Sequence, residues 1–346
     1  MHARVFSESD EAELVAICDT DGGRLKEIGD RFGVERRFDN SRDLFAWGEL
    51  DAVSVVTPDF AHRDIVLAAL EKGLHVLVEK PLDTTVEGCE AIRDAAARAG
   101  KWVMVDFHNR WSPAFVNAKR AVENGEIGRL ISAHFRGNNT KAVATQMLGW
   151  AAQSNVLWFL GSHAIDLLIW LFDSRPRRVY AVSRSGVLSG LGVNTPDVFH
   201  ATIEFDGGGV ASLEHVWILP DTEPNVVDFK CSLIGSDGAI YIDTTHHGAL
   251  TKYTREGGSY GDLLAAPEIH GRPMGFAVES IRHFIECVVR GKRPLVGVEE
   301  GVAVTRTICA LLESAQTGNP VELGEGAVDR SDTRTQRTKT KKKEAQ

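Results

Sequence analysis

The chain has 346 residues, and because a domain usually takes ~100 to 200, its length predicts two domains with a core each. Hydrophobic residues make up 43% and charged residues 25% of the chain, which excludes a disordered, collagenous or low-complexity protein. The net charge of −9 argues against a general surface for nucleic acid or for an anionic membrane, so we expect neither partner.

Apolar runs and cysteines indicate the compartment. No apolar run approaches the ~18 residues of a membrane span, and no segment resembles a signal peptide. The five cysteines lie far apart, without a C-x-x-C pair, which fits reduced thiols better than disulfides or a zinc site. We therefore expect a cytoplasmic protein without a bound metal.

The N-terminal part of the chain alternates apolar runs of strand length with amphipathic stretches of helix length. We expect strands over 14–18, 52–56, 75–78 and 102–106, and helices over 24–32, 59–71 and 85–99, with a helical turn from residue 41. Strands that are apolar on both faces and alternate with helices form a parallel sheet covered by helices. This pattern predicts a doubly wound, Rossmann-type α/β domain over residues 1–107.

The pattern changes after residue 107 to strands joined mostly by Gly and Asp turns. The clearest strands are 178–185, 198–205, 210–216, 226–233 and 239–242, and the helices are 156–172, 276–289 and 299–315. We expect an α+β domain over residues 108–323 with a large open, mainly antiparallel sheet. Residues 324–346 hold seven Lys or Arg against four Asp or Glu, which predicts a disordered basic tail.

Ligands of doubly wound sheets bind beyond the carboxyl ends of the strands, so residues after each predicted strand are the first candidates. Asp19 follows the first strand, where a dinucleotide fold places the acid that binds the adenosine ribose. With Asp21 close by, a 2′-phosphate would meet negative charge, which favours NAD over NADP. The alternative is a turn aspartate that caps the next helix.

Two further strand ends carry polar side chains. Thr57 and Pro58 open a helix whose free amides can face a phosphate or ribose, and His62 lies one turn further on. Capping alone also explains the first two, and a lone helical histidine is often structural. Glu79 and Lys80 follow the next strand, at an edge that suits hydride chemistry, because oxidation of an alcohol also requires a proton acceptor. A solvated pair ahead of a turn proline is the alternative.

The predicted helix 156–172 is apolar nearly all round, yet it carries His163 and Asp166 on one face. On a buried helix these groups need partners or a cavity, and a histidine that relays protons would meet that need. A core histidine with satisfied hydrogen bonds is the alternative.

Several segments match one family in order and in spacing. They are the Thr-Pro of residues 57–58, the Glu-Lys-Pro of 79–81, the Asp-Phe-His-Asn-Arg-Trp-Ser-Pro of 106–113, the Gly-Ser-His-Ala-Ile-Asp of 161–166 and the closing segment 314–321. Together they resemble the Gfo/Idh/MocA oxidoreductases, which include glucose-fructose oxidoreductase and inositol 2-dehydrogenase. The resemblance runs from residue 2 to about residue 323.

The resemblance implies NAD(P)-dependent transfer of hydride between the nicotinamide and a hydroxyl-bearing carbon of a sugar, inositol or related polyol, with NAD as the expected cofactor. It assigns proton transfer to Lys80 and His163, and places His163, Arg110 and Trp150 on the substrate side. In the family the peptide bond before the proline at position 81 is commonly cis. The candidate cofactor-binding residues are Asp19, Thr57, Pro58, His62, Glu79 and Lys80.

Two features depart from the family pattern. Many members place an Asp four residues before the active-site histidine, where this chain has Phe159, so proton transfer would use Lys80 and His163 alone or the reaction would differ. The family also starts with a strand and a G-x-G-x-x-G/A loop that holds the pyrophosphate, and His2 falls just after that loop. We therefore expect Met1 to be an internal methionine, and the chain as written to lack both features and to bind NAD weakly.

Other interpretations stay open. A non-catalytic member of the same fold would use the cleft to bind a sugar or nucleotide or for regulation, which fits Phe159 but leaves Lys80 and His163 unexplained. A plain scaffold would not explain polar groups at several strand ends. An open antiparallel sheet needs its second face covered, and the family pairs through it, so we expect a homo-oligomer.

Overall fold

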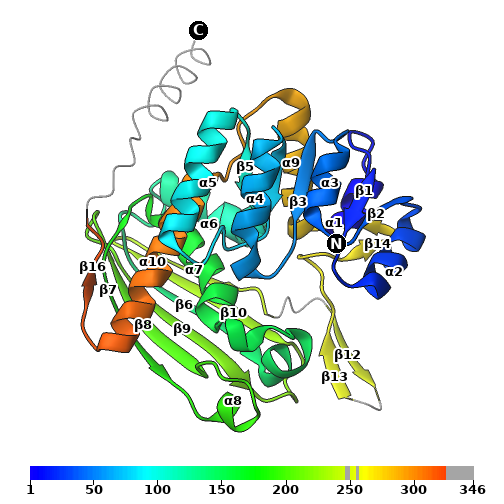
Figure 1. The fold of residues 1–346 in the computed structure, drawn as a ribbon. Helices are drawn as coiled ribbons and strands as arrows, with labels where there is room; N and C mark the ends of the chain where they lie inside the picture. Colours follow the sequence, from blue (N-terminus) through cyan, green and yellow to red (C-terminus); the bar gives the residue numbers. More distant parts are fainter. Residues whose placement is uncertain (246–249, 255–256, 325–346) are drawn as a thin grey trace.

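The computed structural model describes residues 1–245, 250–254 and 257–324, with the parallel strands at one end and a large sheet at the other (Figure 1). The basic tail expected over 324–346 lies outside the described residues from position 325 on. None of the helices in this described part of the chain is long and apolar enough to cross a membrane.

The N-terminal domain holds its parallel strands in two sheets. β1 (Ala16–Cys18) pairs with β2 (Arg36–Phe38), while β3 (Ala52–Val55), β4 (His75–Val78) and β5 (Val103–Val105) form the other sheet. The helices are α1 (His2–Ser7), α2 (Gly22–Phe32), α3 (Ser41–Trp47), α4 (His62–Glu71) and α5 (Val86–Ala99), with the 3-10 helix η1 (Asp59–Ala61). The doubly wound α/β prediction is confirmed. The first strand is less buried than expected, because among the described strands β1 is paired with β2 alone.

Local sequence explains where these helices start and stop. Thr85 caps α5 by accepting a hydrogen bond from the Gly88 amide, and Asn40 caps α3 through the Asp43 amide. α5 ends at Gly100, whose φ of 62° is a left-handed conformation that glycine adopts without strain. These signals place the helix ends within a few residues of the predicted ones.

The C-terminal domain is built on a seven-stranded sheet in the order β11-β10-β6-β9-β8-β7-β16. Its strands are β6 (Leu130–Thr140), β7 (Pro176–Arg184), β8 (Val198–Phe205), β9 (Val210–Leu219), β10 (Val227–Gly235), β11 (Ala239–Asp243) and β16 (Val321–Glu322). Neighbouring strands are antiparallel except β6 and β9, so the sheet is mixed but mainly antiparallel, as predicted. A parallel pair needs a long crossover, and the helices and the β7–β8 hairpin between β6 and β9 supply it.

The predicted helix 156–172 consists of two elements, the π-helix η5 (Leu157–Gly161) and α7 (Ser162–Phe172). The smaller elements are η2 (His108–Trp111), α6 (Pro113–Glu123), η3 (Val143–Met147), η4 (Ala151–Gln153), α8 (Val187–Gly190), β12 (Thr251–Thr254), β13 (Gly257–Tyr260), β14 (Glu268–Ile269) and β15 (Arg272–Pro273). A π-helical turn often marks a functional site, because it displaces the backbone groups of one turn.

Two C-terminal helices join the domains (Figure 1). α10 (Val298–Thr317) contacts α5 of the N-terminal domain and β7 of the large sheet. α9 (Phe276–Arg290) returns to the N-terminal domain and packs against β4. The buried cluster that holds it there contains Val5, Leu77, Met104, Val278, Ile281 and Phe284. Part of the core of the N-terminal domain thus comes from residues after 275.

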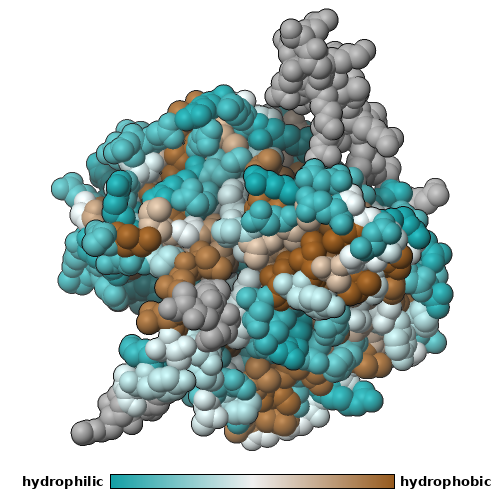
Figure 2. All heavy atoms as spheres, turned by 180° about the vertical axis from the view of Figure 1, so that it is seen from behind, coloured by the Kyte–Doolittle hydropathy of each residue, from teal (hydrophilic) through white to brown (hydrophobic). Residues whose placement is uncertain are grey.

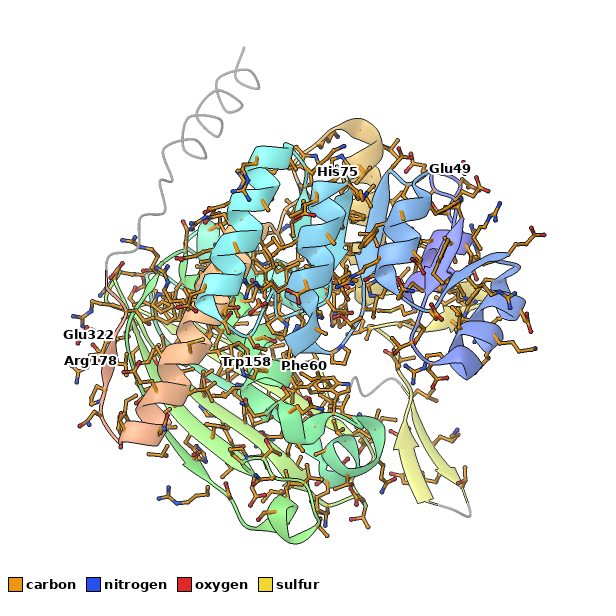
Figure 3. All side chains as sticks on the ribbon, in the orientation of Figure 1. Glu49, Phe60, His75, Trp158, Arg178 and Glu322 are labelled. Carbon is orange, nitrogen blue, oxygen red and sulfur yellow. The ribbon has the colours of Figure 1, made fainter. Side chains whose placement is uncertain are left out.

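The parallel strands direct their carboxyl ends at the junction between the domains. Figure 3 shows His75, the first residue of β4, at the far end of that sheet, whereas Phe60 and Trp158 lie at the level where the domains meet. Phe60 belongs to η1, which follows β3, and Trp158 belongs to η5. Residues that follow β3 and β4 therefore meet the C-terminal domain.

A buried ion pair fixes α7 to the start of the C-terminal domain. The guanidinium of Arg110, in η2, donates to both carboxylate oxygens of Asp166 over 2.6 and 2.8 Å. Only 9% of the Arg110 side chain and 1% of the Asp166 side chain are exposed. Burial raises the pKa of Asp166 to about 6, and the Arg110 charge opposes that shift. Asp166, expected to need a partner in its buried helix, finds it in Arg110.

We predict that Asp166→Leu lowers the free energy of unfolding by ~3 to 5 kcal/mol, because it leaves the buried Arg110 guanidinium without a counter-charge. Replacing both residues, Arg110→Met with Asp166→Leu, should recover most of that loss. Urea unfolding followed by fluorescence measures each value.

The matched control is the exposed pair of Arg177 and Glu204, which also lie 2.6 Å apart. Glu204→Gln should cost no more than ~1 kcal/mol, because water screens a surface pair. Equal losses for Asp166→Leu and Glu204→Gln would show that the buried pair has no special role.

Candidate active site

A cavity of about 700 Å³ lies where the carboxyl ends of the parallel strands meet the C-terminal domain. The N-terminal domain contributes residues that follow β3 and β4, and the C-terminal domain contributes residues of η5, α7, β10 and the segment before α9. The lining residues are Val56, Thr57, Asp59, Glu79, Lys80, His108, Asn109, Trp150, Phe159, Leu160, His163, Asn225, Val226, Val227, Phe229, Thr244, Thr245, Tyr260, Gly261, Asp262, Leu264, Ala265 and Phe276.

Lys80 brings an ammonium group from the end of β4 into this cavity. Its Nζ donates to the backbone carbonyl of Phe159 over 2.7 Å and lies 4.4 Å from the centre of the Phe159 ring. Burial lowers the pKa of Lys80, while the carboxylates of Glu79 and Asp59 oppose that shift. A desolvated ammonium gives up a proton more readily than one in water. The peptide bond between Lys80 and Pro81 is cis, as the resemblance implied.

His163 of α7 lines the same cavity from the opposite domain. Its ring centre lies 4.7 Å from that of His108, which belongs to η2. Burial lowers the pKa of His163 well below its usual 6.5, and the neighbouring His108 and Lys80 act in the same direction. His163 is therefore neutral at pH 7 and able to accept a proton. Its Nδ1 is buried, and within the described residues it has no hydrogen-bond partner.

Three side chains with metal-ligand atoms gather beside the cavity. His2 Nε2 lies 3.1 Å from Glu79 Oε1 and 3.6 Å from Asp106 Oδ2. Burial alone would raise the pKa of Glu79, but its hydrogen bond and attraction to His2 lower it to about 2. These atoms lie within 4.8 Å of one another, so the group could hold a metal ion. The two ring nitrogens of His2 already lie within hydrogen-bond distance of Ser54 Oγ and Glu79 Oε1, so the cluster has partners without a metal.

Thr57, Pro58 and His62 have separate places. Thr57 lines the cavity, whereas Pro58 precedes η1 and is not among the lining residues. The His62 ring is fully buried, and its two nitrogens lie 2.7 Å from the Pro81 carbonyl and 2.9 Å from the Thr57 carbonyl. His62 thus joins the segments after β3 and β4, which is the structural alternative considered from the sequence.

Asp19 follows β1, away from the cavity lining. One carboxylate oxygen accepts a hydrogen bond from the Asp21 amide over 2.9 Å, and the other lies 3.7 Å from a guanidinium nitrogen of Arg24. Asp21, rather than Asp19, caps α2. Asp21 was expected only as a negative charge near Asp19. The guanidinium of Arg24 beside Asp19 was not predicted.

Trp150 and Arg110, which the family resemblance places on the substrate side, have different surroundings. Trp150 lines the cavity, and its ring meets Phe60 edge-on at 6.2 Å. Arg110 is not among the lining residues, because its guanidinium is turned to Asp166 in the buried ion pair. In this arrangement Arg110 holds Asp166, and its contact with a substrate stays a prediction.

His108 and Asn109 line the cavity, although they were not predicted as site residues. Both follow β5, and the carboxyl-end rule that selected Lys80 could have found them. Asn225 and Tyr260 gave no comparable signal, because only the path of the chain around the large sheet brings them to the cavity.

The lining suits the nicotinamide side of a dinucleotide. The cavity lies at the carboxyl ends of parallel strands, where such cofactors bind. It offers the Thr57 hydroxyl and the Lys80 ammonium, and it holds two histidines whose buried Nδ1 atoms have no hydrogen-bond partner among the described residues. Asp19 directly follows β1, at the carboxyl end of the β1–β2 sheet.

Two family models match the chain. One describes an oxidoreductase family with an NAD-binding Rossmann fold and matches residues 1–107, and the other describes the C-terminal alpha/beta domain of that oxidoreductase family and matches residues 119–323. The first match begins at residue 1, so the expectation that the chain lacks the first strand is not borne out. The first glycine of the chain is Gly22.

Individual proteins agree with the family models. The chain is 28% identical over 327 residues to a scyllo-inositol 2-dehydrogenase (NAD+) of Bacillus subtilis, covering 90% of this chain and 89% of that protein. It is 29% identical over 323 residues to a D-xylose 1-dehydrogenase (NADP+) of Haloferax volcanii, covering 91% and 94%. The crystal structure of a myo-inositol 2-dehydrogenase from Lactobacillus plantarum shares the fold, with a TM-score of 0.81, 22% identity and coverage of 93% and 95%. The chain therefore belongs to the Gfo/Idh/MocA family of NAD(P)-dependent oxidoreductases.

Proposed function

We propose that the protein is a dehydrogenase that oxidises a CH–OH group of a sugar, an inositol or a related polyol. The observation that carries this proposal is that Lys80 and His163, from opposite domains, line one cavity at the carboxyl ends of the parallel strands. The two relatives described above are an inositol dehydrogenase and a xylose dehydrogenase, which supports a polyol substrate.

In this proposal a nicotinamide cofactor, when bound, would supply the hydride acceptor, and residues of this chain would transfer the proton. His163, neutral at pH 7, accepts the proton of the substrate hydroxyl. The Lys80 ammonium has three donors, of which one is used by the Phe159 carbonyl, so the others can hold the reacting oxygen or pass a proton to it. Because Phe159 stands where many relatives have an Asp, Lys80 and His163 carry out the transfer alone. Thr57 and Glu79 would flank the nicotinamide, with Trp150 on the substrate side.

Removing either proton-transfer group should disable the enzyme. Lys80→Met and His163→Gln should each lower kcat by ~10²- to 10⁴-fold, the usual contribution of a general acid or base. The measurement is NAD(P)H formation with a panel of inositols, aldoses and their acids. The control Lys72→Met, at the exposed end of α4, should keep the parental rate.

The pH profile of oxidation provides a second readout. Since burial places the pKa of His163 below 6.5, the wild-type kcat/KM should stay constant as the pH falls through 6.5 and decrease only at lower pH, where the imidazole is protonated. That acidic limb should disappear in His163→Gln. A limb centred at or above 6.5 would contradict the neutral buried histidine.

One observation favours a non-catalytic alternative. The apolar Phe159 lies at the position where the family pattern has an Asp. On that interpretation the cavity binds a sugar or nucleotide without turning it over. Binding of NADH together with an absence of turnover across the whole panel would support it, and residual turnover that is unchanged in Lys80→Met would place the chemistry elsewhere.

We infer a preference for NAD over NADP. The Asp19 carboxylate can accept hydrogen bonds from a ribose 2′-hydroxyl and would repel a 2′-phosphate. Arg24, 3.7 Å from Asp19 and on the exposed surface, weakens that repulsion. The relatives use either cofactor, so this pair of side chains is where we expect the choice to be made.

Asp19→Ser should therefore shift the ratio of kcat/KM values for NAD and NADP toward NADP by at least ~10-fold, with Arg24 then free to meet the phosphate. Adding Arg24→Ser should remove most of the gain. The control Asp30→Ser removes an exposed carboxylate of the same domain and should leave the ratio unchanged. An unchanged ratio in Asp19→Ser would exclude this residue from cofactor selection.

We also propose a homo-oligomer that forms through the large sheet. Helices α7 and α10 contact this sheet, and exposed apolar side chains on its strands include Tyr180, Ile234 and Tyr241. Seen from behind, the molecule shows hydrophobic patches between hydrophilic ones (Figure 2). A second copy would cover such a mixed surface.

Tyr241→Glu should shift the oligomer toward monomers, because Tyr241 is 76% exposed on β11 and a buried carboxylate at an interface is unfavourable. Light scattering after size-exclusion chromatography measures the mass. Leu295→Glu, 67% exposed in the segment after α9, is the control. A wild-type protein that is monomeric at micromolar concentration would contradict the proposal.

A further inference from the structure

His108 lies beside the proposed proton-transfer residues, although no family motif assigns it a role here. β4 and β5 pair with Val78 opposite Val105, so each chain leaves its strand at the same level. Lys80 follows two residues after Val78, and His108 follows three residues after Val105. The sheet register therefore brings both side chains to the same edge, and both line the cavity.

Aromatic neighbours on two sides hold the His108 ring. The ring of His163 is centred 4.7 Å away with the planes at 51°, and the ring of Phe276 is centred 5.8 Å away at 33°. These contacts come from α7 and from the start of α9, so elements of two different parts of the chain define the position of this imidazole. A ring whose position is fixed in this way can favour substrates that place a polar atom within hydrogen-bond distance of it.

Both histidines have unused hydrogen-bonding capacity. The buried Nδ1 atoms of His108 and His163 have no hydrogen-bond partner within the described residues, and they are the lining residues of the cavity for which this holds. A buried polar atom without a partner is costly, so native proteins usually satisfy it with water or a ligand. Because both rings line the cavity and lie next to each other, they can serve a ligand with two neighbouring polar groups.

The chemistry of those groups follows from the rings and the surrounding charges. An imidazole can donate or accept, which matches a hydroxyl group, and two ring centres 4.7 Å apart can serve oxygens on adjacent carbon atoms. The carboxylates of Asp59, Glu79 and Asp262 line the same cavity against the single ammonium of Lys80, and this excess of negative charge disfavours an anionic group there. A neutral diol fits these conditions better than a sugar acid.

We propose that His108 binds the hydroxyl group on the carbon next to the one that is oxidised. This inference rests on the proposed dehydrogenase activity. His108 is then a substrate-contacting residue that selects among polyols, while His163 and Lys80 perform the proton transfer.

The test compares two variants on two substrates. His108→Phe keeps an aromatic ring between His163 and Phe276 but removes both nitrogens, and His108→Gln keeps a donor and an acceptor. The substrates are the best inositol or aldose of the panel and its deoxy analogue, which lacks the hydroxyl next to the oxidised carbon. His134→Phe, an exposed position on β6, is the control for replacing a histidine by phenylalanine.

His108→Phe should lower kcat/KM for the full polyol by ~10- to 100-fold, the size expected when a buried hydrogen bond is lost. For the deoxy analogue the same variant should match the wild type, so that the discrimination between the two substrates disappears. His108→Gln should recover part of that discrimination. Melting temperatures of all variants show whether the fold is retained.

The outcomes separate this inference from the proposed function. If the wild type turns over no member of the panel, the dehydrogenase proposal fails, and the inference fails with it. If the wild type is active but His108→Phe lowers kcat/KM equally for both substrates, the dehydrogenase proposal stands, and His108 is a packing residue without contact to the second hydroxyl.

Discussion

The central constraint on this structure is a lysine ammonium buried between two domains. Lys80 leaves β4 of the N-terminal domain, and its Nζ donates to the carbonyl of Phe159 in the C-terminal domain. A buried charge without partners costs several kcal/mol, so the ammonium is tolerated only while both domains hold this arrangement. The carboxylate of Glu79 adds the compensating charge. The domain junction and the candidate active site are consequently one feature, and the position of each depends on the other.

Asp166 and His163, the two ionisable residues of α7, have different roles. Asp166 is paired with Arg110 and holds the helix in place, whereas His163, one turn earlier, lines the cavity with an unpaired Nδ1. The pair fixes the direction of a helix that is otherwise apolar and could pack in several rotations about its axis. The neutral imidazole of His163 therefore owes its position to an ion pair that does not contact the cavity.

Sequence reasoning worked best where function follows from local position. Glu79, Lys80 and Thr57 were selected because they follow parallel strands, and all three line the cavity. It could not decide between two possible uses of one side chain. Arg110 carried the family signal for a substrate contact, yet an ion pair with Asp166 holds its guanidinium away from the cavity. Only the tertiary structure distinguishes these uses, since both require a buried arginine.

By itself the sequence determined the order of the elements, the parallel and mainly antiparallel sheets, and the strand ends that carry chemistry, because hydrophobic periodicity, caps and glycine stops act over a few residues. The tertiary structure decided which distant side chains meet. It placed His108 beside His163. It also returned α9 to the N-terminal domain. Such contacts depend on how whole elements pack, and no short-range pattern in the chain encodes that packing.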